Sequence, residues 1–175
     1  VAANSTSKPD QLLQFSKMAS IYTKYQLKID NPKVALLNIG TEPSKGTELV
    51  KDTYKLMNEE LTNFIGNIES RYIFDSKADV VICDGFTGNI VLKLIEGMMN
   101  YNLNLVSNKL NLKTTNQIND LKSIYDYEQS GAVPILGING LVLKSHGSAS
   151  KISIFNALKN AQKLFNINLI DKFKF

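Results

Sequence analysis

The hydrophobic pattern of this 175-residue chain changes repeatedly between short continuous apolar runs and longer stretches with helical spacing. The run at 80–83 is short, continuous and β-branched, which is typical of a strand covered on both faces. Similar runs predict strands at 34–39 and 141–144, with a shorter apolar run at 64–69. Helical spacing follows three of these runs after a glycine-containing loop. The pattern therefore predicts an α/β fold with a mainly parallel sheet.

Helical spacing of apolar residues predicts four main helices. They are expected after Pro9, through 49–57, from Ile90 and from Ile154. A brief helix is expected around 71–74, and irregular helices are expected over 98–127, where asparagines interrupt the Met and Leu positions. A turn and a strand are expected over 130–137, and a tight turn at 138–140 leads into the last predicted strand.

Composition places the chain among ordinary globular domains, since 43% of its residues are hydrophobic and 21% are charged. The formal net charge of +4 comes almost wholly from lysines scattered along the chain, and Arg71 is the only arginine. Acidic partners would suit this charge, but its even spread with many asparagines is more typical of coding bias. No nucleic-acid motif is recognised, so no nucleic-acid partner is expected.

The cysteine count and the hydropathy pattern limit which cellular location and which cysteine chemistry are expected. The single cysteine, Cys83, excludes an internal disulfide and a CxxC motif, and its place in an apolar run predicts a buried, inert thiol. No apolar run approaches the roughly 18 residues of a membrane span, and no signal-peptide pattern opens the chain. A cytoplasmic location is expected.

Three loops lie between a predicted strand and a predicted helix, at 40–46, 84–89 and 145–150. In an open parallel sheet such loops gather at the carboxyl ends of the strands, where ligands of α/β proteins bind, so one pocket is expected. The glycines of 84–89 and the first amides of the following helix would suit an anion there. An ordinary strand-to-helix connection explains this segment about equally well.

The polar groups of these loops are mostly donors. They comprise the hydroxyls of Thr41, Thr87 and Ser148, the Lys45 ammonium, the Asn89 amide and the His146 imidazole. Donors and a cation suit phosphate or a developing oxyanion, and no dense carboxylate cluster suggests a metal, so no metal or other cofactor is expected. Each residue also has a simpler interpretation as a solvated lysine, a helix cap or a structural hydrogen-bonding group. The residues alone predict an anion-binding α/β domain.

Four stretches carry a resemblance to a known family. They are LLNIGTEPSKGTEL at 36–49, NFIGNIE at 63–69, ADVVICDGFTGNIVLK at 78–93 and KSHGS at 144–148. In this order they resemble the PlsX family of phosphate acyltransferases of bacterial phospholipid synthesis. These enzymes transfer a fatty acyl group from acyl carrier protein to inorganic phosphate and give an acyl phosphate.

The resemblance implies a three-layer α/β/α fold similar to isocitrate dehydrogenase and phosphotransacetylase. It covers about the second half of a typical member, so residues 1–175 are expected to be the C-terminal portion of one phosphate acyltransferase domain whose N-terminal half is absent. It implies acyl carrier protein and phosphate as partners and a homodimer. Peripheral contact with an anionic membrane through 98–112 is a further expectation.

The resemblance also implies roles for individual residues. Lys45 and Asn89 fall on the positions thought to serve catalysis. A cation there would hold the phosphate nucleophile, and an amide donor would stabilise the oxyanion. Substrate or phosphate binding is implied for Asn4, Gly46, Asp84, Gly85, Thr87, Gly88, His146, Gly147 and Ser148.

Some positions depart from the family pattern. Ala2 and Ala132 stand where glycines are usual, and Ser150 stands where the family has aspartate. The family also tends to have an acidic residue within 5–7. Two other functions stay open: a phosphotransacylase that uses acyl-coenzyme A, and a non-catalytic fragment that keeps a dimerisation or membrane-docking surface.

Overall fold

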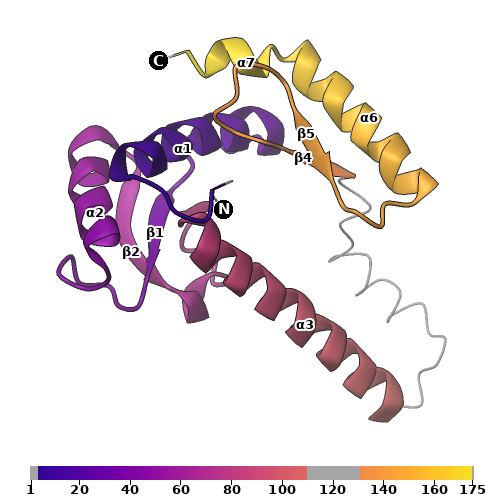
Figure 1. Ribbon diagram of the computed structural model, residues 1–175, viewed down its shortest axis with the longest axis horizontal. Coiled ribbons are helices and arrows are strands. Elements are labelled where there is room, and N and C mark those ends of the chain that lie inside the picture. The colour runs from indigo at the N-terminus through magenta and orange to yellow at the C-terminus, as the bar shows by residue number, and fades with distance from the viewer. Residues whose placement is uncertain (1–3, 110–130, 175) are drawn as a thin grey trace.

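The computed structural model describes residues 4–109 and 131–174, and these form an α/β structure (Figure 1). The order of the N-terminal elements is α1 (Pro9–Tyr22), η1 (Thr23–Leu27), β1 (Val34–Asn38), α2 (Glu48–Glu60), β2 (Phe64–Glu69), η2 (Ser70–Tyr72), β3 (Val80–Ile82) and α3 (Gly85–Lys109). The C-terminal elements are β4 (Ala132–Pro134), β5 (Leu143–Ser145), α6 (Lys151–Asn166) and α7 (Leu169–Lys172). The predicted alternation of strands and helices is confirmed.

Three parallel strands form the main sheet, in the order β2-β1-β3. Val34 of β1 pairs with Phe64 on one side and with Val80 on the other. Because β1 is the central strand, four of its five residues are buried, which explains its continuous apolar sequence. β3 is an edge strand of this sheet, although its sequence is as apolar as that of a central strand.

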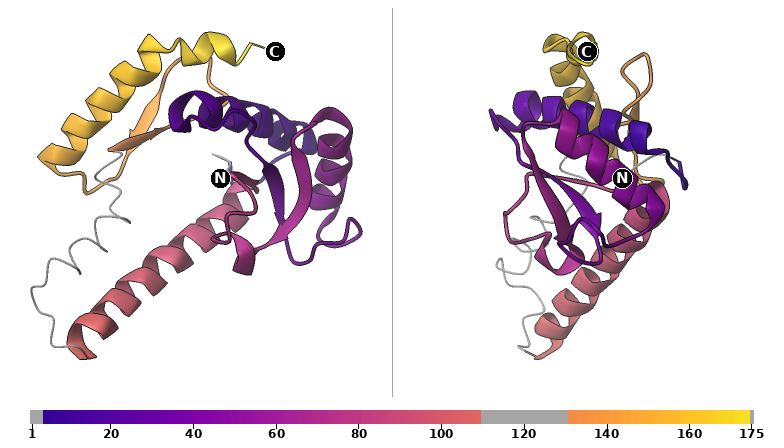
Figure 2. Two further views of the ribbon diagram at one scale, coloured as in Figure 1. Left: turned by 180° about the vertical axis from the view of Figure 1, so that it is seen from behind. Right: turned by 90° about the vertical axis from the view of Figure 1, so that its left-hand side faces the viewer.

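The two faces of the sheet are covered differently. Helices α1 and α2 lie together on one face, as the right-hand view of Figure 2 shows, and Leu12 and Met57 pack there against Val34 and Leu36. On the other face a second cluster contains Ala35, Leu37, Ile68 and Cys83. The described residues that cover it lie around η2 and at Val91, near the start of α3.

A second unit follows the main sheet along the chain. β4 and β5 pair antiparallel and are joined by the predicted turn, and α6 packs against both strands. The expectation that the third loop follows a strand of the same parallel sheet is therefore wrong, because a connection this short can join only antiparallel neighbours. Gly131 lies against the backbone of α6, and its carbonyl accepts from the Ser145 hydroxyl at 2.8 Å.

Helix α1 and its continuation η1 join the second unit to the first. The Gln26 side-chain amide donates to Asn160 Oδ1 of α6 at 3.1 Å, and the Lys172 ammonium lies 4.2 Å from the centre of the Tyr25 ring. Phe15 of α1 lies against Gly137, which follows β4. One helix thus covers the sheet and supports the C-terminal unit.

Helix α3 is one continuous helix from 85 to 109 and projects away from the sheet (Figures 1 and 2). The expectation of irregular helices is wrong for residues 98–109, since the asparagines there do not interrupt the helix. Residues 110–127 of that prediction lie outside the described part. Large apolar side chains are exposed along one side of α3, at Ile90, Leu94, Met98, Tyr101 and Leu105.

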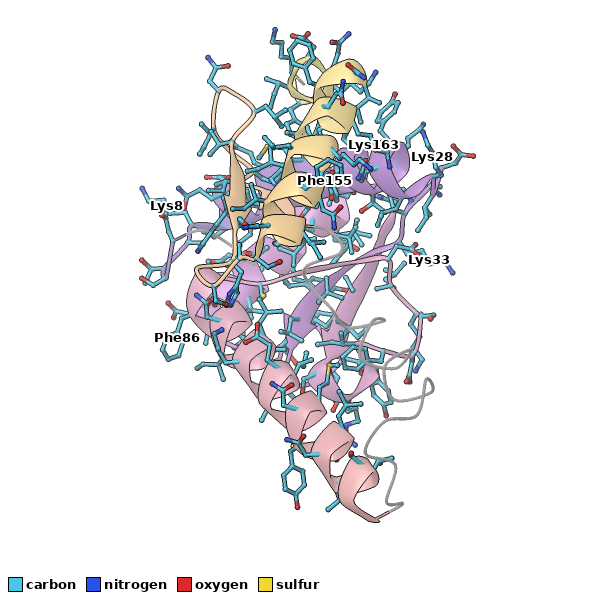
Figure 3. The ribbon with its side chains drawn as sticks, turned by 90° about the vertical axis from the view of Figure 1, so that its right-hand side faces the viewer. Lys8, Lys28, Lys33, Phe86, Phe155 and Lys163 are labelled. Carbon is cyan, nitrogen blue, oxygen red and sulfur yellow. The ribbon has the colours of Figure 1, made fainter. Side chains whose placement is uncertain are left out.

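The predicted helix is confirmed as α6, but most of its predicted apolar stripe is not buried. Leu164 is fully buried, whereas Ile154, Phe155 and Leu158 are more than half exposed. Figure 3 shows Phe155 on the outward side of α6. Within the described residues, no helix has the length and hydrophobicity needed to cross a membrane.

Candidate functional site

The two residues predicted to be catalytic follow neighbouring parallel strands. Lys45 lies in the loop between β1 and α2, and Asn89 lies one turn into α3, which follows β3. β1 and β3 pair directly with each other, so both segments leave the sheet at its carboxyl edge. The sheet therefore directs Lys45 and Asn89 to the same edge.

The loop from β1 to α2 presents the Lys45 side chain to solvent. The Lys45 amide donates to the Glu42 carbonyl at 3.1 Å, which closes a turn, and Gly46 follows in the left-handed region with φ of 89°. The Lys45 stem passes close to Gly40, where a Cβ would approach Lys45 Cγ to 3.2 Å. Among the described residues Lys45 makes no ion pair, so its ammonium is available to an anion.

The start of α3 is capped by protein groups. Asp84 Oδ1 accepts from the Thr87 amide at 2.7 Å, and Asp84 Oδ2 accepts from the Thr87 hydroxyl at 3.0 Å. The amides of Gly85 and Phe86 donate to the carbonyls of Asn4 and Ser5, both at 3.1 Å, and the Gly88 amide donates to the Asp84 carbonyl. The helix therefore begins at Gly85, several residues earlier than the pattern of apolar residues predicted.

This capping changes what the segment can bind. The four amides that a helix N-terminus would offer to an anion already have acceptors, so an anion there would have to displace Asn4 and Ser5. Asn89 differs from its neighbours, since its side chain is exposed and makes no hydrogen bond to any described residue. Phe86, beside it, points outward from the start of α3 (Figure 3).

The third predicted loop forms a local cluster between β5 and α6. His146 Nδ1 lies 2.8 Å from the Ser148 hydroxyl and accepts from the Ser148 amide at 3.2 Å. Because an N–H donates to Nδ1, the neutral imidazole carries its proton on Nε2. Gly147 has open space around it, and Ser150 caps α6 by accepting from the Ser153 amide.

A cleft of about 690 Å³ lies along the edge of β3 that pairs with no other described strand. α1, β3, α3 and the β4–β5 unit enclose it, and its lining is mainly apolar, with Phe15, Val81 and Leu136 among the contributors. Of the predicted site residues, Asn89 alone lines this cleft. Lys45 and the 146–148 loop lie outside it, so the single pocket expected from the sequence is not formed by the described residues.

Cys83 follows β3 and borders the same cleft. Its thiol is buried, and this burial raises the pKa of Cys83 above its ordinary value. The prediction of a buried cysteine is confirmed. In the described part of the chain no group of three or more His, Cys, Asp or Glu side chains is placed to hold a metal ion.

Sequence reasoning missed two asparagines that organise the Lys45 loop. The Asn38 side chain donates to the Lys45 carbonyl at 3.1 Å, and the Asn67 side chain donates to the Glu42 carbonyl at 3.0 Å. Each asparagine interrupts an otherwise apolar strand, and this interruption is the sequence feature that could have identified it. Their partners are backbone carbonyls, which no side-chain pattern reveals.

Comparisons with known proteins found relatives that match nearly the whole chain. Residues 1–172 match the family model described as "Fatty acid synthesis protein". A phosphate acyltransferase from Halothermothrix orenii is 41% identical over 98% of this chain and 55% of its own length. One from Acetivibrio thermocellus is 43% identical over 98% of this chain and 53% of its own length. One from Desulfitobacterium hafniense is 41% identical over 99% of this chain and 55% of its own length.

The fold and the loops define an α/β domain that presents polar side chains at the carboxyl edge of a parallel sheet. The chain belongs to the fatty acid synthesis protein family, whose model matches nearly its whole length. It spans about half the length of the curated relatives that it matches.

Proposed function

We propose that this chain carries part of the active site of a phosphate acyltransferase, which moves a fatty acyl group from acyl carrier protein to inorganic phosphate. The observation that carries this proposal is the pair formed by Lys45 and Asn89. Both are exposed, neither has an ion-pair or side-chain hydrogen-bond partner among the described residues, and they follow adjacent parallel strands. The curated relatives are named phosphate acyltransferase, which supports an acyl transfer that involves phosphate.

The proposed chemistry needs a bound anion and an oxyanion donor. The Lys45 ammonium would bind phosphate and hold one of its oxygens against the thioester carbonyl carbon. That oxygen forms the new bond to the acyl carbon, and Asn89 Nδ2 donates to the carbonyl oxygen as it becomes negative. The carbon–sulfur bond then breaks, and the carrier thiolate takes a proton from solvent. No covalent intermediate on the protein is required.

The experiment measures acyl phosphate made from a long-chain acyl carrier protein and phosphate, with Lys45→Ala and Asn89→Ala beside the wild type. We expect Asn89→Ala to lower turnover about 10²-fold or more, because removal of one oxyanion donor typically has that effect. Lys45→Ala should also lower turnover, because bound phosphate loses its cation. Lys93→Ala, a lysine paired with Glu96 further along α3, is the matched control and should leave turnover unchanged. Equal turnover in all four proteins would refute the assignment.

The acyl donor is tested in the same assay. The proposal expects acyl carrier protein to be preferred over acyl-coenzyme A at equal concentration. The reverse preference would favour a coenzyme A-dependent phosphotransacylase. No turnover by a folded chain with either donor would favour a non-catalytic fragment or a need for the rest of the relatives' length.

A second proposal concerns the exposed apolar side of α3, formed by Ile90, Leu94, Met98, Tyr101 and Leu105. Its polar side carries Lys93 paired with Glu96 and several asparagines, and no cluster of basic residues occurs on its described part. This charge pattern suits a second copy of the chain better than an anionic membrane, which attracts basic helices. We propose a homodimer through α3, with peripheral membrane contact as the weaker alternative.

Sedimentation and vesicle binding separate these two partners. We expect Leu94→Glu to shift the chain from dimer to monomer in sedimentation velocity, while Asn104→Glu on the polar side does not. Binding to anionic vesicles that Leu94→Glu abolishes, in a chain that is monomeric throughout, would favour the membrane instead.

A further inference from the structure

Asn38 is the last residue of β1 and holds both ends of the loop that carries Lys45. Its Oδ1 accepts from the amide of Ile39 at 2.8 Å, and its Nδ2 donates to the carbonyl of Lys45 at 3.1 Å. One side chain therefore joins the first and the last part of the loop. The strand fixes Asn38 itself, because β1 is hydrogen-bonded on both sides.

The backbone around Asn38 is shaped to accept it. Gly46 has φ of 89°, and a Cβ at this position would approach Asn38 Oδ1 to 2.5 Å. Both the left-handed conformation and the contact therefore require glycine here. From the neighbouring strand β2, Asn67 Nδ2 donates to the carbonyl of Glu42, which also accepts from the Lys45 amide.

Little else fixes this loop. Residues 41–45 are exposed, and the Ile39 side chain is 79% exposed, so apolar burial contributes little to the position of Lys45. Neither Glu42 nor Lys45 makes an ion pair with a described residue. The two asparagine amides are thus the main groups that tie the loop to the sheet.

We propose that Asn38 is a positioning residue for Lys45. Its amide fixes the carbonyl of Lys45, and hence the direction in which the side chain leaves the loop toward the carboxyl edge of the sheet. This inference rests on the proposed function for its catalytic meaning, but the positioning itself is a property of the described structure. Asn38 touches no reacting atom and acts only through Lys45.

Two variants of Asn38 separate the effect of losing its Nδ2 donor from the effect of losing the whole side chain. Asn38→Ala removes both hydrogen bonds. Asn38→Asp keeps the shape and the acceptor for the Ile39 amide, but it sets a second oxygen against the Lys45 carbonyl. Asn63→Ala is the matched control, since Asn63 Nδ2 donates to the Pro32 carbonyl at 2.6 Å, near the amino ends of β1 and β2.

The first measurement needs no enzymatic activity. Trypsin cleavage of the folded chain at the Lys45–Gly46 bond is followed by mass spectrometry, with folding of each variant checked by circular dichroism. We expect both Asn38 variants to be cleaved there at least about fivefold faster than the wild type, since each loses at least one typical hydrogen bond, while Asn63→Ala is unchanged. Unchanged cleavage in both Asn38 variants, or equal acceleration in Asn63→Ala, would overturn the proposal.

The second measurement is acyl-phosphate formation in the same proteins. We expect Asn38→Asp to lower kcat, and Lys45→Ala to cost much less in the Asn38→Ala background than in the wild type, since both changes act on one group. Independent, multiplying effects would contradict positioning through Lys45. A wild type that makes no acyl phosphate would contradict the proposed function, whereas the proteolysis result would still decide the role of Asn38.

Discussion

The amide of Gly85 donates to the carbonyl of Asn4 at 3.1 Å, although the two residues lie at opposite ends of the α/β unit in sequence. Together with the contact from Phe86 to Ser5, this bond fills the amino end of α3 with protein acceptors. A glycine-rich turn before a helix usually indicates an anion site. Here the same features fix the base of a long helix, whereas the Lys45 and Asn89 side chains have no hydrogen-bond or ion-pair partner among the described residues.

The capping of α3 by Asp84 leads to a first prediction. Asp84→Ala should lower the free energy of unfolding by about 1 kcal/mol, because the Thr87 amide loses its acceptor at the positive end of the helix. Asp84→Asn keeps an oxygen acceptor, so it should lower the free energy of unfolding by only a few tenths of a kcal/mol. Urea denaturation of the three proteins measures the difference, and equal losses in both variants would contradict a capping role.

Gly131 should be intolerant of any side chain. Its φ is 69°, and a Cβ would collide with the backbone of α6 at Ser153 and Ala157. Gly131→Ala should therefore destabilise the protein by roughly 2–5 kcal/mol, from backbone strain and from displacement of α6. Gly140→Ala is the control, since nothing lies within 4 Å of a Cβ there. Thermal unfolding of both variants tests this, and similar melting temperatures would refute the packing of α6 on Gly131.

Cys83 predicts a dependence of stability on alkaline pH. Burial raises the pKa of its thiol above the ordinary 9.0, so the unfolded thiol ionises before the folded one. Stability from this group is complete below about pH 9 and is lost as the pH rises through the folded pKa.

Denaturant unfolding between pH 8 and 11 measures this effect. Cys83→Ala should be less stable at pH 8 because it loses buried volume, but its stability should fall less steeply above pH 9. Tyr22, whose pKa is also raised by burial, remains in both proteins and contributes the same residual slope. Parallel curves for the two proteins would contradict the assignment to Cys83.

Because the outer edge of β3 pairs with no other described strand, we predict that this chain associates beyond the proposed dimer. Exposed edges with apolar sequence pair readily with other strands, and the cleft beside β3 is mainly apolar. Val133 is 56% exposed and lines that cleft, whereas Val142 is 41% exposed and lies outside it. Val133→Lys should reduce high-order association in sedimentation velocity, and Val142→Lys should not. Equal effects of both lysines would point to general charge rather than to the β3 edge.

The sequence predicted most strands and helices because their apolar periods are clear. β1 is buried on both faces, so its run is continuous, and the apolar stripe of α2 matches the packing of its Tyr54 against Phe64 of β2. The strands β4 and β5 and the tight turn between them were predicted, but their separation from the parallel sheet was missed, since a strand followed by a loop and a helix has the same pattern in either sheet. Backbone direction has no side-chain signal there.

The candidate site was predicted only in part. Lys45 and Asn89 were singled out by residue type and by family resemblance, and the pairing of β1 with β3 brings their segments to one edge. The contacts that organise them, from Asn38 to the Lys45 carbonyl and from Gly85 to the Asn4 carbonyl, end on backbone oxygens. Every residue has such an oxygen, so no pattern of side chains identifies the partner.

The 25 residues of α3 make it about 37 Å long at 1.5 Å per residue. Asn89 lies near its anchored base, and the far end projects from the body of the protein (Figure 1). A tilt of α3 by about 10° about its base would therefore move its outer end by about 6 Å, while Asn89 would mainly change its orientation. A partner that binds the outer end of α3 would therefore change the angle at which the Asn89 amide faces the cleft.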